Sequence, residues 1–193
     1  MIRLMGEKDC VEVSRIHKEA LEGDYLPTLG LNVLKTIYKG LLKDKESFGY
    51  VAEENGKVIG FVTGSENTKN LFKKVIKQEF TPLSYYTLLA LIKKPCLIKN
   101  LIQTFQYNEK VKTDANAELI SIAIKEEHRG KDLGKSLTKI LINDFKKRNI
   151  NKIKVTVNKS NIGANKFYQR IGFKHIETFK IYGKEMNLYT LGI

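Results

Sequence analysis

The chain has 193 residues, of which 42% are hydrophobic and 28% are charged, and its formal net charge at pH 7 is +13. This length suits one domain with a full core, so we expect residues 1–193 to form a single domain. No stretch reaches the roughly 20 apolar residues that a transmembrane helix needs, and residues 1–10 lack the pattern of an export signal. We therefore expect a cytoplasmic protein in which Cys10 and Cys96 are reduced thiols.

Lysine supplies most of the positive charge. Arginine occurs only at positions 3, 15, 129, 148 and 170. Proteins that read nucleic acid tend to use the guanidinium fork, so we do not expect nucleic acid to be the main partner. A small ligand that carries phosphate would nevertheless benefit from the basic surface. The cysteines and histidines lack the spacing of metal ligands, so we expect no metal.

Residues 1–64 predict two helices and three strands. Apolar residues recur with helical spacing after Asp9, which is a good helix cap, and Gly23 ends the pattern. Further along, two strand-like runs flank Asn55-Gly56, which is the strongest short signal for a β-hairpin. The expected elements are a strand at 1–5, helices at 10–22 and 32–42, and strands at 48–54 and 57–64.

Residues 67–116 differ in character from the rest, because they are rich in lysine, leucine, isoleucine and aromatic residues. Apolar pairs at 71/72, 75/76, 97/98 and 101/102 have helical spacing, and Pro82 and Pro95 interrupt the pattern. We expect two or three amphipathic helices here. They would form a helical insertion within the domain, before its central strand.

From residue 117 onward strands and helices alternate, and the chain ends in paired strands. The expected elements are strands at 117–124 and 153–157, a helix at 133–147, a helix that Ser160 or Asn161 caps and Gly172 ends, and a hairpin of 173–182 and 184–191.

The loop HRGKDLGKSL at residues 128–137 joins a strand to a helix. In that setting several backbone N–H groups converge with the positive end of the helix dipole, and Arg129, Lys131 and Lys135 add charge. The loop therefore has the outline of a pyrophosphate cradle, although an ordinary turn with solvated lysines fits the same letters. Asp132 is unexpected in a cradle, since a carboxylate that pointed inward would repel phosphate.

Two stretches together resemble the GNAT acetyltransferase superfamily. The first is AELISIAIKEEHRGKDLGKSL, whose loop is similar to the family pattern Arg/Gln-x-x-Gly-x-Gly/Ala. The second is N-x-x-N-x-x-A-x-x-F-Y-x-x-x-G-F at residues 158–173. The resemblance covers residues 117–174 and implies an α/β (α+β) fold, in which helices flank a mixed, mostly antiparallel central sheet.

The resemblance also implies an N-acetyltransferase that transfers the acetyl group of acetyl-CoA to a primary amine by direct attack in a ternary complex. The acceptor would be a small-molecule or peptide amine, and an amino sugar, a polyamine, an amino acid and a protein terminus all remain open. The alternative is a non-catalytic module that keeps the fold, either CoA-sensing or basic and associated with nucleic acid. Asp132 and the charge of +13 favour that alternative.

Carried over position by position, the loop and the helix start would hold the pyrophosphate of CoA, and the strand before them would run beside its pantetheine arm. The implied cofactor-binding residues are Ile122, Ala123, Ile124, Arg129, Gly130, Lys131, Asp132, Leu133, Gly134, Lys135, Asn161, Ala164 and Phe167. Asp132 replaces the first glycine of the family pattern. Asp tolerates left-handed geometry better than most residues, so we expect it to be tolerable for shape and slightly costly for charge.

The resemblance places Tyr168 near the thioester sulfur as a proton donor and Glu118 on the central strand as the base. A carboxyl inside an apolar strand should have a raised pKa, which suits a base. Other interpretations stay open from the residues alone. Tyr168 could be a core aromatic beside Phe167, and Glu118 could face solvent at a strand end.

The role of residues 67–116 also stays open. The expected helices must bury an apolar face, and they could do so as a lid over the acceptor end of the cleft, as the surface of a homodimer, or on an anionic membrane surface. As a lid, they would bring Tyr85, Tyr86 and Phe105 to an acceptor pocket.

Overall fold

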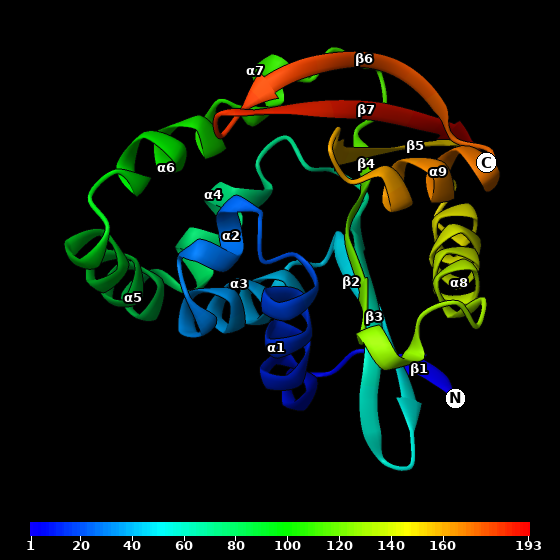
Figure 1. Ribbon diagram of the computed structural model, residues 1–193, viewed down its shortest axis with the longest axis horizontal. Coiled ribbons are helices and arrows are strands. Elements are labelled where there is room, and N and C mark those ends of the chain that lie inside the picture. The colour runs from blue at the N-terminus through cyan, green and yellow to red at the C-terminus, as the bar shows by residue number, and fades with distance from the viewer.

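The computed structural model describes residues 1–193, apart from the side chains of residues 108 and 109. Its strands form a seven-stranded sheet in the order β1-β2-β3-β4-β5-β7-β6 (Figure 1). They are β1 (Ile2–Leu4), β2 (Ser47–Glu54), β3 (Lys57–Ser65), β4 (Ala117–Ile124), β5 (Lys152–Asn158), β6 (Lys174–Ile181) and β7 (Lys184–Gly192). Each neighbouring pair is antiparallel except β4 with β5, which are parallel. The mixed, mostly antiparallel sheet confirms the expected fold class.

The helices fill the connections between these strands. They are α1 (Cys10–Ala20), α2 (Tyr25–Thr28), α3 (Leu31–Lys43), α4 (Leu71–Gln78), α5 (Phe80–Lys93), α6 (Leu97–Phe105), α7 (Tyr107–Lys110), α8 (Leu133–Lys147) and α9 (Ile162–Arg170). Of these, α8 is the crossover that two parallel neighbours require, because a tight turn cannot join them.

The sheet separates two hydrophobic cores. Side chains alternate along β3, so Phe61 packs in the core formed with α1 and α3, while its neighbour Val62 packs in the core formed with α8. As a result α1 and α3 cover one face of the sheet and α8 covers the other (Figure 1). α9 lies against β5.

The pairing between β4 and β5 is short. Their parallel register includes only Ala117 with Ile153 and Glu118 with Lys154, although β4 continues to Ile124 and β5 to Asn158. On its other side β4 stays paired with β3 through Ile124. The edge of β4 that faces β5 is therefore unpaired beyond Glu118, and the sheet opens there.

The segment between β3 and β4 forms four short helices, α4 to α7, where the sequence predicted two or three. α4 is anchored on α3, because a Cβ atom at Gly40 would lie only 2.8 Å from Cγ1 of Val75, so glycine allows the close approach. α5 is not the amphipathic helix expected: its residues 80–93 are all described and none is buried. Within the described chain, no helix has both the length and the apolar character needed to cross a bilayer.

A buried histidine joins the N-terminal helices to the sheet. His17 of α1 is only 5% exposed, its Nδ1 lies 2.5 Å from the hydroxyl of Tyr38 in α3, and its ring stacks on Phe61 of β3. Burial lowers the pKa of His17 from 6.5 to about 4, so the folded protein holds the ring neutral.

Replacing His17 with glutamine should flatten the acid side of the stability curve. As pH falls from 6.5 towards 4, the unfolded chain binds a proton at His17 that the folded chain refuses, so the free energy of unfolding should fall by about 3 kcal/mol. His17→Gln cannot bind that proton and still offers Tyr38 a hydrogen bond. Urea unfolding of both proteins between pH 4 and pH 8 measures the difference, and parallel curves would show that His17 titrates normally.

Candidate active site

The end of β4, the start of α8 and the body of α9 converge at one place. A Cβ atom at Gly134 would lie 3.4 Å from Cδ1 of Ile124 and 3.6 Å from the ring of Phe167. Residues that the sequence separates by more than forty positions thus become neighbours beside the unpaired edge of β4. Ile122, Ala123 and Ile124 form the last part of that edge.

The loop that leads into α8 offers a run of unused hydrogen-bond donors. From Gly130 to Lys135, no backbone N–H group donates to another group in the described part of the chain. Leu133, Gly134 and Lys135 form the first turn of α8, where N–H groups have no partner within the helix. Such a run, together with the helix dipole, suits an anionic ligand.

Asp132 adopts the backbone shape that its position requires. Its φ is 55° and its ψ is 9°, which is left-handed geometry, and Gly130 also has a positive φ of 79°. The carbonyl of Asp132 accepts the first hydrogen bond of α8, from Ser136. The side chain is exposed and caps nothing, and within the described residues it forms no ion pair with Lys131 or Lys135. The loop therefore keeps its shape with a carboxylate where the family pattern has glycine.

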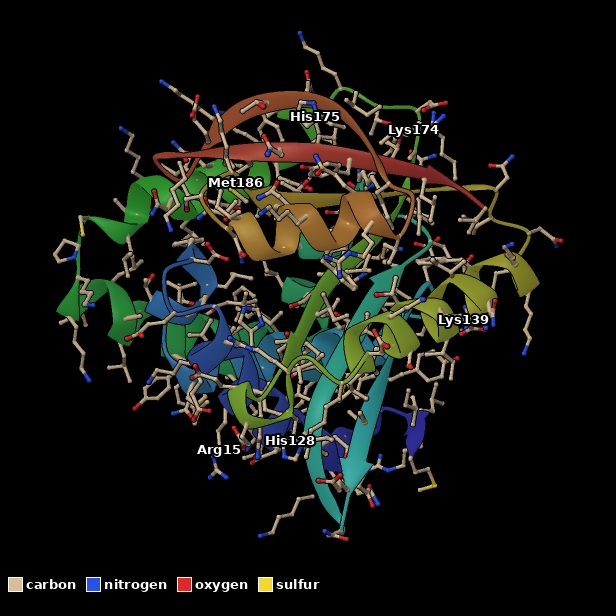
Figure 2. The ribbon with its side chains drawn as sticks, turned by 45° about the vertical axis from the view of Figure 1, so that its right-hand side comes forward. Arg15, His128, Lys139, Lys174, His175 and Met186 are labelled. Atoms are coloured by element: carbon tan, nitrogen blue, oxygen red, sulfur yellow. The ribbon has the colours of Figure 1, made fainter. Side chains whose placement is uncertain are left out.

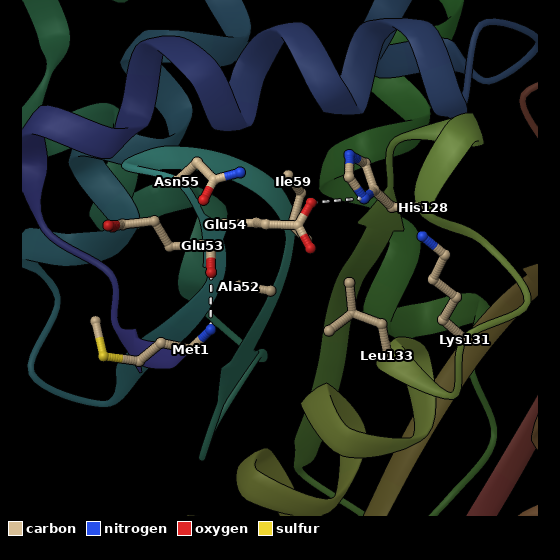
Figure 3. Close-up of a pocket in the computed structure, with 9 residues that line it drawn as sticks. All are labelled: Met1, Ala52, Glu53, Glu54, Asn55, Ile59, His128, Lys131 and Leu133. Carbon is tan, nitrogen blue, oxygen red and sulfur yellow. Dashed lines mark hydrogen bonds and ion pairs between the residues drawn. The ribbon is translucent and has the colours of Figure 1, made fainter.

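Arg129 ties the loop to the end of β4, because its Nε donates to the carbonyl oxygen of Ile124 at 3.2 Å. A hollow of about 490 Å³ lies between this loop and the β2–β3 hairpin (Figure 3). Lys131 lines it, but so does Glu54, which approaches His128 to 3.5 Å. The carboxylate makes this hollow a poor place for phosphate, so the N–H groups of the loop, and not this hollow, are the candidate anion site.

α9 is held in place by two asparagines with different tasks. The side-chain oxygen of Asn161 caps the helix by accepting from the N–H of Ala164 at 3.0 Å. Asn165, which the sequence analysis did not single out, is buried and donates to the carbonyls of Asn158 and Asn161, while its oxygen accepts from Tyr189. Its position inside a predicted helix could have drawn attention to Asn165, because asparagine destabilises a helix interior unless its side chain is hydrogen-bonded. These bonds fix α9, and with it Phe167 and Tyr168, against the sheet.

Tyr168 is 4% exposed and packs edge-on against Phe167 and Phe173, at centroid distances of 5.2 and 5.4 Å. Its hydroxyl makes no hydrogen bond to any group in the described chain. Burial raises the pKa of Tyr168 above its ordinary value, so the phenol keeps its proton at neutral pH. The side chain is thus both a core aromatic and an uncommitted proton donor.

Glu118 is buried where β4 and β5 separate, and does not face solvent. Its Oε1 accepts from the hydroxyl of Tyr107 in α7 at 2.6 Å, and the same hydroxyl lies 2.7 Å from Oγ1 of Thr156. Its Oε2 lies 3.7 Å from Nζ of Lys154, which is also buried, and accepts no hydrogen bond from the described residues. Tyr107 therefore holds Oε1, while Oε2 faces an ammonium group that is too far away for a hydrogen bond.

Burial raises the pKa of Glu118 above its ordinary value, while the charge of Lys154 and hydrogen bonds with Tyr107 and Thr68 oppose that rise. A carboxyl shifted upward in this way binds protons more readily than a solvated one. Sequence reasoning missed both partners. Lys154 could have been suspected as a lysine inside an apolar strand, but nothing in the sequence connects Tyr107 to Glu118.

The histidines take no part in this arrangement. His17 is a buried residue of α1. His128, which follows the end of β4, and His175, which lies on β6, are at opposite ends of the molecule (Figure 2). In the described residues, no group of three or more histidine, cysteine or acidic side chains could hold a metal ion. Cys10 is buried, which raises the pKa of its thiol to about 11, and Cys96 is exposed on the distant α5–α6 connection.

An opened parallel pair, a donor-rich loop at a helix start and a buried carboxylate together suit a protein that holds an extended anionic ligand and moves a proton. The acetyltransferase (GNAT) family matches residues 12–173, and the chain belongs to this family. It is an N-acetyltransferase, as the resemblance of its C-terminal half implied.

Individual proteins that are similar to this chain in sequence or fold are also described as acetyltransferases. An uncharacterized N-acetyltransferase of Methanocaldococcus jannaschii is 26% identical over 175 residues, which cover 90% of this chain and 78% of that protein. The fold is shared with ribosomal-protein-alanine N-acetyltransferase of Brucella melitensis, with a TM-score of 0.65, 15% identity, and coverage of 100% of this chain and 99% of that one. It is shared equally with a Salmonella typhimurium protein described as an acetyltransferase and solved with its cofactor acetyl-CoA, with a TM-score of 0.64, 15% identity, and coverage of 100% and 92%.

Acetyl-CoA is the acetyl donor of this family. The donor-rich run from Gly130 to Lys135 fits a pyrophosphate, and the unpaired edge of β4 offers backbone groups to an extended arm. Asp132 does not interrupt that run, since its N–H is among the free donors. The residues present therefore fit the family's acetyl donor.

Replacing Asp132 with glycine should leave the affinity for acetyl-CoA unchanged or raise it, because glycine keeps the left-handed geometry and removes a negative charge near the pyrophosphate. Asp132→Ala is the matched control: it removes the same charge but should cost about 1 kcal/mol of stability, since alanine resists a positive φ. Calorimetric titration with acetyl-CoA and thermal unfolding separate the two effects. A large loss of affinity in Asp132→Gly would show that the carboxylate itself contributes to binding.

Replacing Tyr107 with phenylalanine should move the acidic limb of the pH–rate profile to higher pH. The hydrogen bond from Tyr107 lowers the pKa of Glu118, so its loss raises that pKa. If Glu118 is the base, it then loses its charge at a higher pH as the pH falls. Tyr182→Phe is the control, because the hydroxyl of Tyr182 bonds to Thr104 and not to Glu118. An unmoved limb in Tyr107→Phe would separate Glu118 from the titration that limits the rate.

Proposed function

We propose that this N-acetyltransferase transfers the acetyl group of acetyl-CoA to a primary amine by direct attack in a ternary complex. The observation that carries the proposal is the buried Glu118, whose Oε2 lacks a hydrogen-bond partner within the described chain at the point where β4 and β5 separate. A buried carboxylate oxygen without a donor is costly unless a ligand supplies one. An ammonium ion supplies both a hydrogen bond and the proton that must be removed.

The loop and helix start are proposed to bind the pyrophosphate through the N–H groups from Gly130 to Lys135, with Arg129 setting the position of the loop. The backbone of Ile122 to Ile124 is proposed to run beside the pantetheine arm, with one of its N–H groups holding the thioester oxygen. Gly134 and Phe167 close the space around this arm, and the capped start of α9, with Asn161 and Ala164, keeps Phe167 there.

When bound, acetyl-CoA supplies a carbonyl that an amine can attack and a thiolate that leaves. Glu118 takes a proton from the ammonium, which leaves the nitrogen with a free electron pair. Its raised pKa makes that transfer easier than it would be for a solvated glutamate. The charge of Lys154 opposes that rise in pKa and so favours the ionised form of the carboxyl.

Tyr168 is proposed to donate its hydroxyl proton towards the departing sulfur. Burial keeps the phenol protonated, and no described group competes for its hydrogen bond. The aromatic contacts with Phe167 and Phe173 fix the ring, so that only the hydroxyl is available for chemistry.

The helical segment from α4 to α7 is proposed to wall the acceptor end of the cleft. Its last helix brings Tyr107 to Glu118, and its α6 contacts the β6–β7 turn, where Gln103 accepts from the N–H of Tyr182 and Thr104 bonds its hydroxyl. The ring of Tyr182 stacks on Tyr25 of α2 at 4.8 Å. Three separate parts of the chain thus meet beside the base.

Acetyl transfer to a panel of amines, followed by mass spectrometry of the products, tests the proposed function. Tyr168→Phe should lower kcat by about 10²-fold or more, the usual contribution of a positioned acid, and should leave acetyl-CoA affinity nearly intact because only a hydroxyl is lost. Glu118→Gln should remove the acidic limb of the pH–rate profile.

Acetyl-CoA binding without turnover on any amine of a broad panel would instead favour a CoA-sensing module. If both variants keep the parent rate and pH profile while chemistry limits the rate, the roles of Tyr168 and Glu118 are wrong.

A further inference from the structure

A cavity of about 280 Å³ lies between α2 and α3 on one side and α4, α5 and α6 on the other. Its walls are almost entirely apolar, with Leu29 and Val33 facing Leu91 and Leu101 across the space. The helices between β3 and β4 therefore leave an unfilled space where they pack against α2 and α3. Of the three aromatic residues that the sequence predicted for an acceptor pocket, Phe105 lines this cavity, whereas Tyr85 and Tyr86 do not, and Tyr85 is 59% exposed.

One polar group in this cavity lacks a partner. Tyr25 is 6% exposed and lines the cavity, and its hydroxyl is buried without a hydrogen bond from the described residues. The Thr104 hydroxyl is near enough to lower the pKa of Tyr25, but it donates its own hydrogen bond to the carbonyl of Asn100. Buried hydroxyls are normally bonded, so this one points to a ligand with a polar group at that depth.

The cavity adjoins the base through two of its wall residues. Thr104 lines it and comes three positions before Tyr107, whose hydroxyl bonds Glu118. Tyr25 stacks on Tyr182, and the charge of Glu118 also acts on Tyr182. A molecule with its amine at Glu118 could therefore extend an apolar tail past Tyr182 into the cavity.

We propose that the cavity binds the tail of the acceptor, so that the substrate class is an amine whose apolar tail has roughly six to ten carbons and carries a polar group, such as a hydroxyl, where it meets Tyr25. This rests on the proposed function, because it assumes that Glu118 meets the amine. The size follows from volume, since an apolar cavity of about 150 Å³ holds one benzene ring. Sugars and polyamines would leave the cavity empty or bury polar groups in it without partners.

The cavity can be tested without acetyl transfer, by calorimetric titration with n-octanol in the absence of acetyl-CoA. We expect binding in the parent protein and at least tenfold weaker binding in Thr87→Trp, which fills the space from α5. Ser84→Trp, at an exposed position of the same wall, is a second filling variant in case the first folds poorly. Tyr85→Trp is the matched control, since Tyr85 lies outside the cavity, and it should bind octanol like the parent.

Tyr25→Phe distinguishes a ligand-binding hydroxyl from a merely structural one. Removing an unpartnered buried hydroxyl should leave the thermal unfolding temperature of the free protein equal or higher, and should weaken octanol by roughly two- to tenfold. A lower unfolding temperature with unchanged octanol affinity would show that the hydroxyl supports the fold instead.

The tail is then tested with a series of n-alkylamines as acceptors. Below the length that fills the cavity, kcat/KM should rise by roughly three- to fourfold per methylene, and the rise should vanish in Thr87→Trp. If octanol binds but no amine is acetylated, the cavity binds apolar ligands and the proposed function is wrong. Acetylation without dependence on chain length, together with no octanol binding, would overturn the cavity proposal and leave the proposed function intact.

A second inference comes from the outward side of α5 and α6, at the opposite side of the molecule from α8 and α9 (Figure 1). Large apolar residues exposed on these two helices are Phe80, Tyr85, Leu88, Leu89, Ile92, Ile98, Ile102 and Phe105, of which Leu88 and Phe105 also line the cavity. Between Glu79 and Glu109 the sequence contains no acidic residue, while Lys93, Lys94 and Lys99 are exposed. We call this the α5–α6 face.

We propose that the α5–α6 face rests on an anionic lipid bilayer. Apolar residues rimmed by lysine are typical of helices that lie in the membrane interface, and at 14 residues α5 is too short to span one. A second copy of this chain fits less well. A symmetric interface sets the same patch against itself, so the lysines would face each other without acidic partners.

Co-sedimentation with vesicles tests this surface. We expect the protein to bind vesicles that contain phosphatidylglycerol and to bind pure phosphatidylcholine vesicles at least tenfold more weakly. The triple variant Lys93→Gln, Lys94→Gln, Lys99→Gln should lose most of this binding, whereas Lys139→Gln, Lys146→Gln, Lys147→Gln, an equal loss of charge on α8, should keep it. Equal losses in both variants, or a dimer in solution that Ile92→Glu dissociates without any vesicle binding, would overturn the proposal.

Discussion

β4 and β5 separate directly after the register pair of Glu118 and Lys154, and the rest of this structure depends on that separation. Glu118 and Lys154 face each other in the last register pair, and both are buried. Beyond them the sheet offers backbone groups instead of pairing them, so a ligand can take the place of a strand partner. Because this pair lies where β4 and β5 separate, the position that ends their pairing also holds a carboxyl group that could move a proton.

A buried ion pair is poor support for stability, since the attraction of its charges seldom exceeds the cost of removing both from water. The pair is therefore more readily understood through the chemistry it permits. Lys154 and Tyr107 both counter the upward shift that burial imposes on the pKa of Glu118. Tyr107 donates a hydrogen bond to Oε1 of the carboxylate, whereas Oε2 faces the ammonium group of Lys154 at 3.7 Å, beyond hydrogen-bond distance.

Most of the framework could be predicted from the sequence. Strand and helix periods, Asn55-Gly56 and the loop before α8 are local signals, and the structure places elements close to where these signals put them. The left-handed geometry of Asp132 was also foreseeable, since Asp132 stands where the family pattern has glycine and Asp tolerates this geometry better than most residues. What could not be foreseen is how distant segments meet. The hydrogen bond of Tyr107 with Glu118, the stacking of Tyr25 on Tyr182 and the unfilled space beside α5 depend on the packing of short helices whose apolar pattern indicates burial without naming a partner.

The most direct test of this account is the titration of Glu118 itself, followed by carbon NMR of the labelled side-chain carboxyl, with Glu118→Gln to assign its signal. We expect a midpoint above the ordinary glutamate range that coincides with the acidic limb of the pH–rate profile for acetyl transfer. A carboxyl that titrates in the ordinary range, well apart from that limb, would contradict the assignment of Glu118 as the base.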